Sequence, residues 1–380
     1  MPYITIHTKK QPRQITIEEV LFGIPDDFFT PHRDTADTRT YYVDRVSDDL
    51  SRKVNFVEMH KAISAFNEKY RMLIDNPDKQ SLYYTFTIPK RSGGLRRIDA
   101  PCDELKNALR EFKTILERVF YASYHTSAFA YVKQRCAVDS VRRHQANKSR
   151  WFLKLDFSKF FPSTSMEFLT SMLYKTFPLC EYINAGYGYK EDFERALSLC
   201  FLNGGLPQGT PVSPLLTNMM MIPIDHEISK MCREHSPKLL YTRYADDMLI
   251  SSPYDFQWTD VCASVEKILG DVNAPMQINR KKTRYGSSSG SNWNLGVMLN
   301  KDGDITVGHA KKKLLKTKVF QFMTDFAAKN PWNIEDTQQL QGEISYYKMV
   351  EGDVIQEIID KYSEKFGFSV MAVIKDVITS

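Results

Sequence analysis

The chain contains three adjacent pairs of aspartates, and one pair lies where carboxylates could take part in chemistry. Asp26-Asp27 and Asp48-Asp49 lie in polar stretches, where a solvated turn is the ordinary explanation. Asp246-Asp247 instead lies between the apolar runs 239–241 and 248–250. Two carboxylates at a hairpin tip between buried strands repel each other unless a cation lies beside them. A simple β-turn without a ligand is the alternative, because Asp is common in hairpin loops.

A third carboxylate, Asp156, ends the apolar run 151–155 and is predicted to end a strand. If this strand lies beside the hairpin, Asp156, Asp246 and Asp247 converge on one point. Clustered carboxylate oxygens suit Mg²⁺, which stays partly hydrated and shares its ligand shell with substrate phosphates. Two such ions would activate an attacking oxygen and stabilise the leaving oxygen of an in-line phosphoryl transfer. The spacing allows this site without requiring it.

Composition excludes several other classes of protein. The 380 residues include 51 Lys+Arg and 46 Asp+Glu, a net charge of +5, and 42% are hydrophobic, as in soluble globular proteins. The length predicts two or three domains. The longest near-apolar run, 211–224, is too short to cross a bilayer, and the N-terminus lacks a signal pattern. We therefore expect a cytoplasmic protein without a membrane partner. Six widely spaced cysteines fit reduced thiols better than disulfides or a zinc site.

The elements around the carboxylates are predicted to form an antiparallel sheet backed by helices. Their order resembles the split βαβ plan. Strands are expected at 83–88, 95–98, 151–156, 239–252 (two strands), 277–283 and 293–299. Helices are expected at 55–74, after Pro101, near Ser165, and at 212–232 and 259–269, and the chain turns helical and basic beyond Gly303.

Several ordered motifs resemble those of bacterial reverse transcriptases. Tyr244-Ala245-Asp246-Asp247 resembles the YxDD box of that family. The other matching segments are the finger hairpin Ile88–Pro101, the first palm strand Lys154–Ser163, the LPQGxxxSP block Leu206–Pro214, and the two palm-closing blocks Lys282-Thr283 and Leu295-Gly296. Five or six motifs in the same order over residues 83–299 are highly specific.

The resemblance implies an α+β fold, the right-hand polymerase with fingers, palm and thumb. Residues 1–80 would form a partly helical N-terminal extension. Residues 81–300 would form the fingers and the palm, whose antiparallel sheet is backed by helices. Residues 301–380 would form a short helical thumb.

The same resemblance assigns the catalytic and metal-binding residues. Asp156, Asp246 and Asp247, with the backbone carbonyl of Phe157, would hold two Mg²⁺ ions, for which Mn²⁺ is a substitute. Lys282 would neutralise or protonate the departing pyrophosphate.

Nucleotide-binding residues follow from the resemblance as well. Lys90, Arg96 and Arg97 would bind the triphosphate, since guanidinium groups suit phosphate oxygens; a solvated hairpin face is the alternative. Gln208 and Gly209 would line the nucleotide pocket, where glycine allows close backbone approach. Phe161 would be the steric gate that excludes a 2′-hydroxyl, and Phe160 would belong to the core.

Contacts to the primer and template would come from later residues. Leu295 and Gly296 would hold the primer end. Lys311, Lys312 and Lys316, together with Lys313 and Lys318, would contact the duplex backbone through its phosphates. A solvated helix face is the alternative for these lysines.

The implied function is RNA-directed DNA polymerisation, making cDNA from a cognate non-coding RNA in a retron-like or anti-phage defence system. Its partners would be an RNA template, a DNA or RNA primer, dNTPs and an effector protein, and a homo-oligomer stays open. The compact thumb favours this group. Two departures, 140–144 in place of NAxxH and 294–296 in place of VTG, favour a defence-associated relative. The alternatives are a template-independent or protein-primed DNA polymerase and a group II intron-like reverse transcriptase.

Overall fold

The computed structural model describes residues 55–89, 94–119, 124–288, 297–300 and 302–379, and the backbone of four short strands nearer the N-terminus. These strands form two antiparallel hairpins, β1 (Tyr3–His7) with β2 (Pro12–Thr16) and β3 (Pro31–Thr35) with β4 (Thr38–Tyr41). The chain divides into two compact units. The first comprises 1–136, 153–251 and 256–285, and the second comprises 137–152, 252–255 and 286–380.

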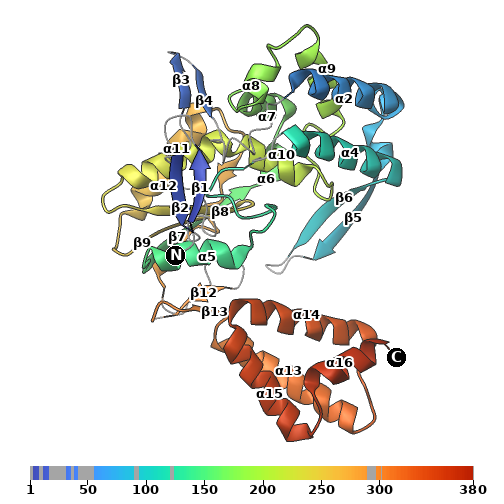
Figure 1. Cartoon of the computed structure of the whole chain (residues 1–380), viewed down its shortest axis with the longest axis vertical. Helices are drawn as coiled ribbons and strands as arrows, with labels where there is room; N and C mark the ends of the chain where they lie inside the picture. Colours follow the sequence, from blue (N-terminus) through green and yellow to red (C-terminus); the bar gives the residue numbers. More distant parts are fainter. Residues whose placement is uncertain are drawn as a thin grey trace. The chain divides into compact units, whose positions relative to one another are not determined.

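The main sheet has the strand order β10-β7-β9-β8, and β11 also pairs with β7. Figure 1 labels β7, β8 and β9 of this sheet. Its strands are β7 (Trp151–Ser158), β8 (Leu240–Tyr244), β9 (Asp247–Ser252), β10 (Gln277–Ile278) and β11 (Arg284–Ser287). The prediction that the first strand ends at Asp156 is wrong by two residues. β7 continues because Phe157 and Ser158 pair with Ile278 and Gln277 of β10.

Two helices replace the single helix predicted at 212–232. They are α10 (Ser213–Met220) and α11 (Ile222–Glu234), and Pro223 lies in the first turn of the second helix. Proline has no N–H and its ring clashes with the carbonyl four residues earlier, so one continuous helix cannot pass through this position. α11 packs against β8 and against α12 (Trp258–Asp271), and α10 packs against α7 (Met166–Leu173).

The helices nearest the finger hairpin form a second layer of the first unit. α2 (Phe56–Lys69) packs against α9 (Tyr189–Ser198) and α4 (Asp103–Val119). Phe112 lies at their centre, with its ring 5.3 Å from Phe66 and 6.3 Å from Phe193. The remaining helical turns of this unit are α3 (Arg71–Ile74), η2 (Lys79–Leu82), α6 (Phe160–Ser163) and α8 (Leu179–Tyr182).

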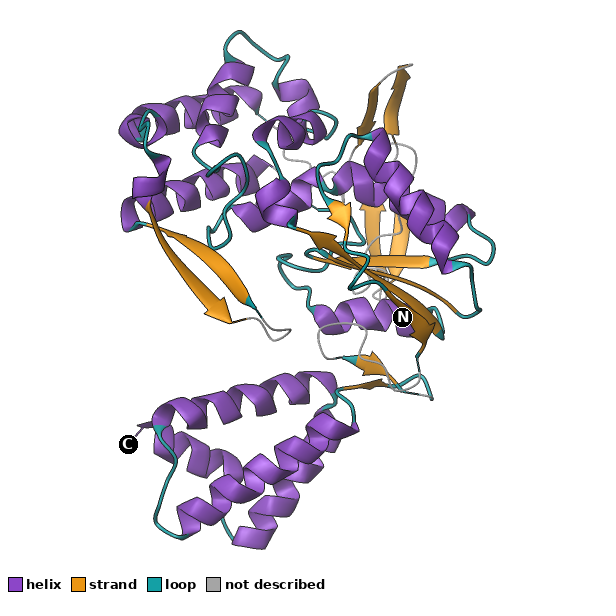
Figure 2. Cartoon of the chain, turned by 180° about the vertical axis from the view of Figure 1, so that it is seen from behind, coloured by secondary structure: helices purple, strands orange, loops and turns teal. Residues whose placement is uncertain are grey.

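The predicted finger hairpin is present as β5 (Tyr83–Pro89) and β6 (Leu95–Pro101). It is antiparallel, with Phe86 opposite Ile98 and Ile88 opposite Arg96. Figure 2 shows it as a two-stranded ribbon that extends from the helices of the first unit.

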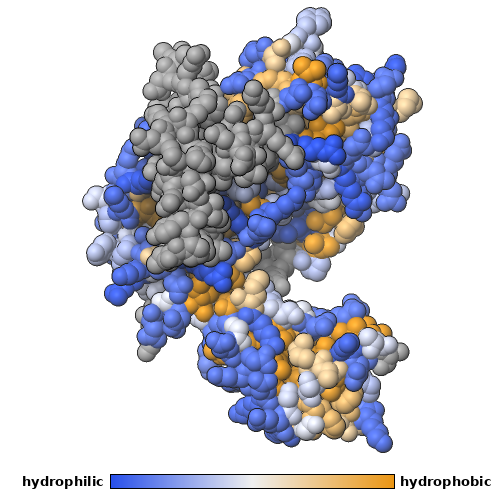
Figure 3. Space-filling view, in the orientation of Figure 1, coloured by the Kyte–Doolittle hydropathy of each residue, from blue (hydrophilic) through white to orange (hydrophobic). Residues whose placement is uncertain are grey.

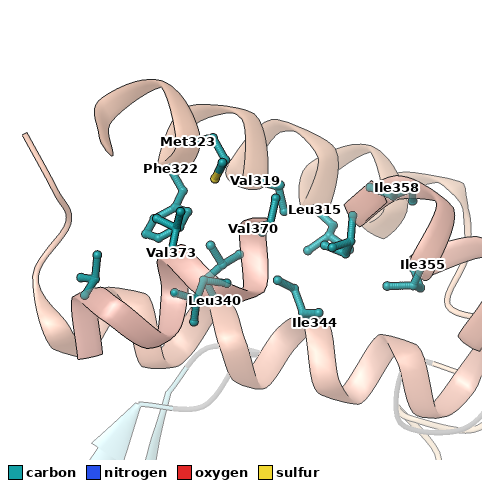
Figure 4. Close-up of a cluster of buried hydrophobic side chains, with 13 residues drawn as sticks. Leu315, Val319, Phe322, Met323, Leu340, Ile344, Ile355, Ile358, Val370 and Val373 are labelled. Carbon is teal, nitrogen blue, oxygen red and sulfur yellow. The ribbon is translucent and has the colours of Figure 1, made fainter. Parts of the chain in front are cut away.

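The second unit contains α5 (Ala137–Ala146), the pair β12 (Met298–Leu299) and β13 (Ile305–Thr306), and a bundle of four helices. The bundle helices are α13 (His309–Ala327), α14 (Ile334–Val350), α15 (Gly352–Phe366) and α16 (Val370–Thr379). Apolar side chains from all four point toward one another, among them Phe322, Leu340, Ile355 and Val373 (Figure 4).

Other apolar side chains remain on the outside of this bundle (Figure 3). Among the exposed ones are Leu314, Phe320 and Val354. No helix in the described part of the chain is both long enough and apolar enough to span a membrane.

Candidate functional site

The three predicted carboxylates come from two neighbouring strands and the turn beside them. Asp156 is on β7, and Asp246 and Asp247 are at the β8–β9 turn; β7 and β9 are adjacent in the sheet. The backbone N–H of Phe157 donates to the Asp246 carbonyl at 3.2 Å. This bond fastens the turn to β7 directly beside Asp156. The convergence predicted from the sequence is therefore present in the backbone.

The β8–β9 turn is a tight two-residue connection, because Tyr244 pairs directly with Asp247. Its first residue, Ala245, has a left-handed φ of 58°. A positive φ at this position is the geometry that lets a two-residue loop follow the twist of its strands. Alanine adopts it against a steric penalty. The turn that carries Asp246 is therefore held in place by its surroundings.

Two lysines bind two of the carboxylates. Lys282 donates to both oxygens of Asp156 at 3.0 Å, and Lys154 donates to Asp247 Oδ2 at 2.9 Å. Lys282 reaches this position because the strand predicted at 277–283 stops at Ile278. The chain then turns, and Asn279 N–H donates to the Asp156 carbonyl at 2.7 Å.

Burial and mutual repulsion govern the charge of this site. Burial raises the pKa of Asp156 and the Asp247 charge adds to it, although Lys282 opposes the shift. Burial, then the charges of Asp247 and Asp156, raise the pKa of Asp246. In the described part of the chain, Asp246 makes no ion pair with a basic side chain. A bound cation would relieve this repulsion.

The donor set suits a hard cation such as Mg²⁺, because it consists of carboxylate oxygens on one edge of the sheet. Across the described residues, however, no three His, Cys, Asp or Glu side chains are arranged closely enough to hold a metal ion. Lys282 binds Asp156 and Lys154 binds Asp247, so each ammonium group lies at one carboxylate of this set. Phe157, whose carbonyl was expected to be a further ligand, is adjacent to Asp156 on β7.

The predicted nucleotide-pocket residues contact the finger hairpin. The Gln208 carbonyl accepts a hydrogen bond from Asp99 N–H on β6 at 3.0 Å. Gly209 has a φ of 119°, and a Cβ there would lie 3.1 Å from the Ile98 side chain and 3.2 Å from the Asp99 carbonyl. Only glycine combines this φ with so close an approach.

The two neighbouring phenylalanines differ in burial, and Phe160 belongs to the core as predicted. Phe160 is buried and stacks on Phe157 with ring centres 5.4 Å apart, whereas Phe161 is partly exposed. The segment is held against the Leu206–Pro214 block, because Leu206 N–H donates to the Phe161 carbonyl at 3.1 Å. A Cβ on Gly205 would overlap the Pro162 carbonyl oxygen, so glycine is required at that position.

The family model that describes reverse transcriptases (RNA-dependent DNA polymerases) matches residues 88–322, more than half of the chain. The chain belongs to the reverse transcriptase family. Retron Ec83 reverse transcriptase of Escherichia coli is 28% identical over 295 residues, covering 74% of this chain and 87% of the relative. Retron Ec73 reverse transcriptase of the same organism is 26% identical over 283 residues, covering 73% and 86%. These matches confirm the predicted retron-type resemblance.

A solved structure, apo telomerase from Candida tropicalis, is similar in fold, with a TM-score of 0.50 and 12% sequence identity. The alignment covers 85% of this chain and 67% of the telomerase chain. At that identity the likeness concerns the fold alone, and it confirms the α+β polymerase fold. The chain is an RNA-directed DNA polymerase, and an RNA template is therefore one of its partners.

In this reverse transcriptase the two hairpin arginines have different surroundings. Arg96 and Arg97 are successive on β6, so their side chains point to opposite faces. Arg97 donates from Nε to both Asp99 oxygens at 2.9 and 3.2 Å, and Asp99 also accepts from Thr85 at 2.7 Å. Arg97 is thus bound within the hairpin. Lys90 lies outside the described residues.

The predicted primer and template residues fall into two groups. Leu295 and Gly296 lie outside the described residues. Lys311, Lys312 and Lys316 are on α13 of the second unit. Lys312 donates to Glu351 at 2.9 Å, while Lys316 is exposed.

Three further residues near the carboxylates were not among the predicted site residues. Lys154 belongs to the Lys154–Ser163 motif and binds Asp247. Tyr131 has a φ of 60°; burial of its hydroxyl, then the charges of Asp246 and Tyr244, raise its pKa, although 59% of the residue is exposed. Arg243, inside the strand that leads to the turn, is buried.

Proposed function

We propose that this reverse transcriptase polymerises DNA by two-metal nucleotidyl transfer at Asp156, Asp246 and Asp247. The observation that carries the proposal is the hydrogen bond from Phe157 N–H to the Asp246 carbonyl, which places the turn beside Asp156. Divalent ions bound there would activate the primer hydroxyl and stabilise the leaving oxygen. Lys154 and Lys282 would release the carboxylates as the ions bind, leaving Lys282 beside the departing pyrophosphate.

Around this centre, Arg96 would bind the triphosphate, and Gln208 and Gly209 would form the wall of the nucleotide pocket. Support comes from the contact of this wall with β6 through the Asp99–Gln208 hydrogen bond. The partly exposed ring of Phe161 would exclude ribonucleotides.

The template would be a cognate non-coding RNA of a retron-like element, and the cDNA would serve an anti-phage defence system with an effector protein. Support for a retron setting comes from relatives that are matched over 86–87% of their own length.

Purified protein supplied with Mg²⁺, labelled dNTPs and an RNA template-primer tests the chemistry. The wild type and Asp271→Asn should extend the primer, whereas Asp246→Asn should not; Asp271 is an exposed carboxylate at the end of α12 and is the matched control. DNA synthesis by Asp246→Asn, or none by the wild type, would contradict the proposal.

Sequencing the nucleic acid that copurifies with the protein tests the template. A single structured RNA, with cDNA that is absent from the Asp246→Asn preparation, is the expected result. DNA that matches no RNA would favour template-independent synthesis, and DNA linked to a tyrosine would favour protein priming. Phage plaque counts on cells with wild-type or Asp246→Asn protein test the defence role.

A further inference from the structure

Arg243 has the largest side chain among the fully buried residues of the described chain. It is on β8, three residues before Asp246. Its Nε donates to Asp225 Oδ1 at 2.9 Å and its Nη2 to Asp225 Oδ2 at 2.7 Å, and Asp225 is itself fully buried on α11. Tyr241 hydroxyl donates to the same carboxylate at 2.7 Å.

The third nitrogen of the guanidinium binds the β8–β9 turn that carries Asp246. Arg243 Nη1 donates to the Ala245 carbonyl at 3.1 Å and to Asn218 Oδ1 on α10 at 3.2 Å. Asn218 Nδ2 in turn donates to the Ala130 carbonyl at 2.9 Å. One side chain therefore joins α11, α10 and the residue that precedes Asp246.

The backbone of Arg243 is also fixed. Its N–H donates to the Ser127 carbonyl at 2.7 Å, and its carbonyl accepts from Phe129 N–H at 2.9 Å. The loop that carries Tyr131 is thus tied to the same strand.

Stability alone does not explain this arrangement. Replacing a buried ion pair by well-packed apolar side chains is often neutral or stabilising. Ala245 holds an unfavourable left-handed φ, which persists only where the surroundings determine it. The hydrogen bond from Arg243 to the carbonyl of that residue supplies such a determinant, and lysine lacks the fork geometry to make it together with the Asp225 pair.

We infer that Arg243 is a positioning residue, which fixes the Ala245 carbonyl and thereby holds the Asp246-Asp247 turn in the conformation that accepts divalent cations. Asn218 supports this role by orienting the Nη1 group. The inference rests on the proposed metal-dependent polymerisation.

Arg243→Lys tests the inference, with Tyr241→Phe as its matched control. The lysine keeps a positive charge beside Asp225 and loses the bond to Ala245, while the phenylalanine removes a bond to the same carboxylate without affecting the turn. We expect Arg243→Lys to lower kcat about 10- to 100-fold, as removal of a supporting contact behind a metal ligand does. The Mg²⁺ concentration for half-maximal activity should rise about tenfold.

A second measurement omits substrates. Titration of Mn²⁺ into the protein without nucleotide should raise the melting temperature of the wild type and of Tyr241→Phe at similar concentrations. Arg243→Lys should require about tenfold more Mn²⁺. If Arg243→Lys does not fold, Asn218→Ala decides the question, because it preserves the Asp225 ion pair; it should change the Mn²⁺ titration in the same direction.

The inference would be overturned if Arg243→Lys required the same Mn²⁺ concentration as Tyr241→Phe. If Arg243→Lys does not fold, Asn218→Ala takes its place in this comparison. Either result would leave the polymerase proposal intact. Failure of the proposed function would look different, since wild type and Tyr241→Phe would then show no metal-dependent DNA synthesis at all.

Discussion

At the scale of single residues, the site combines one buried and two partly buried carboxylates with two lysines that bind two of them. Asp156 and Asp247 have ammonium partners, whereas Asp246 has repulsive neighbours and a raised pKa. The repulsion that raises the pKa of Asp246 costs stability when its carboxyl is ionised. Function and stability are therefore expected to oppose each other at Asp246.

Asp246→Asn should stabilise the metal-free protein while abolishing DNA synthesis. The pKa of Asp246 is higher in the folded state than in the unfolded state. Below the unfolded pKa the carboxyl is protonated in both states and favours folding fully; as pH rises through the folded pKa, that contribution to stability is lost. At neutral pH the uncharged amide avoids this loss. We expect a gain of about 1 kcal/mol in the free energy of unfolding, measured with a chelator present.

The pH dependence supplies the control for this prediction. The advantage of Asp246→Asn should shrink as pH falls through the folded pKa of Asp246, and it should be gone below about 4, where the aspartate of the unfolded chain is protonated too. Asp271→Asn should change stability by less than about 0.5 kcal/mol. A lower melting temperature for Asp246→Asn at neutral pH would show that its charge is compensated by a partner.

Phe161→Ala should admit ribonucleotides, because the partly exposed ring is the group expected to contact the sugar. The ratio of kcat/KM for dGTP and GTP measures this discrimination. Phe160→Ala should instead destabilise the fold by about 3–5 kcal/mol, since its ring is buried against Phe157. An unchanged ratio in Phe161→Ala would remove Phe161 from the role of gate.

At the scale of elements, the finger hairpin gives different surroundings to two arginines, Arg96 and Arg97, that look equivalent in the sequence. Arg96→Ala should raise the KM for dNTPs about tenfold or more, because a hydrogen bond to a charged group contributes roughly 1.5–3 kcal/mol. Arg97→Ala should lower stability by at most about 1 kcal/mol, since its pair with Asp99 is half exposed. Equal effects of both variants on KM would show that Arg97 leaves Asp99 to bind nucleotide.

The lysines of helix α13 also differ in their surroundings, since Lys312 binds Glu351 and Lys316 is exposed. Lys316→Ala should weaken template-primer binding and reduce the slope of log affinity against log salt by about 1, as loss of one phosphate contact does. Lys312→Ala should mainly lower the stability of the bundle, because Lys312 binds the largely buried Glu351. Fluorescence anisotropy at several salt concentrations distinguishes the two. An unchanged slope in Lys316→Ala would favour a solvated helix face.

The strands and most helices could be predicted from the sequence because their signals are local. Apolar runs marked β7, β8 and β9, and Ser165 marked the start of α7 as its N-cap. The break at Met221 was missed because the apolar pattern continues through it, although Pro223 carried the signal.

Residues of the site were harder to predict where their roles depend on distant partners. The three aspartates stand out in the chain because each adjoins an apolar run. Arg243 does not, since its partner Asp225 is 18 positions earlier, on another element. The distinction between Arg96 and Arg97 likewise required the position of Asp99 across the hairpin face.

At the scale of the whole molecule, the two units have separate cores. Leu340→Ala should destabilise the bundle by about 2–5 kcal/mol, because Leu340 is buried among the side chains of four helices. Hydrogen exchange should then show lost protection in residues 309–379 and unchanged protection in residues 153–251. Equal loss in both ranges would show that the units unfold together.

The absence of a side chain at Gly205 has a consequence for directed evolution of this polymerase. The backbone carbonyl of Pro162 occupies the space that any Cβ would need, so the segment that carries Phe161 lies in direct backbone contact with Gly205, which precedes the Leu206–Pro214 block. A library that seeks acceptance of modified sugars would vary Phe161, the residue proposed to contact the sugar. At position 205 every replacement would have to displace the Pro162 backbone, and such a library is expected to return only glycine there.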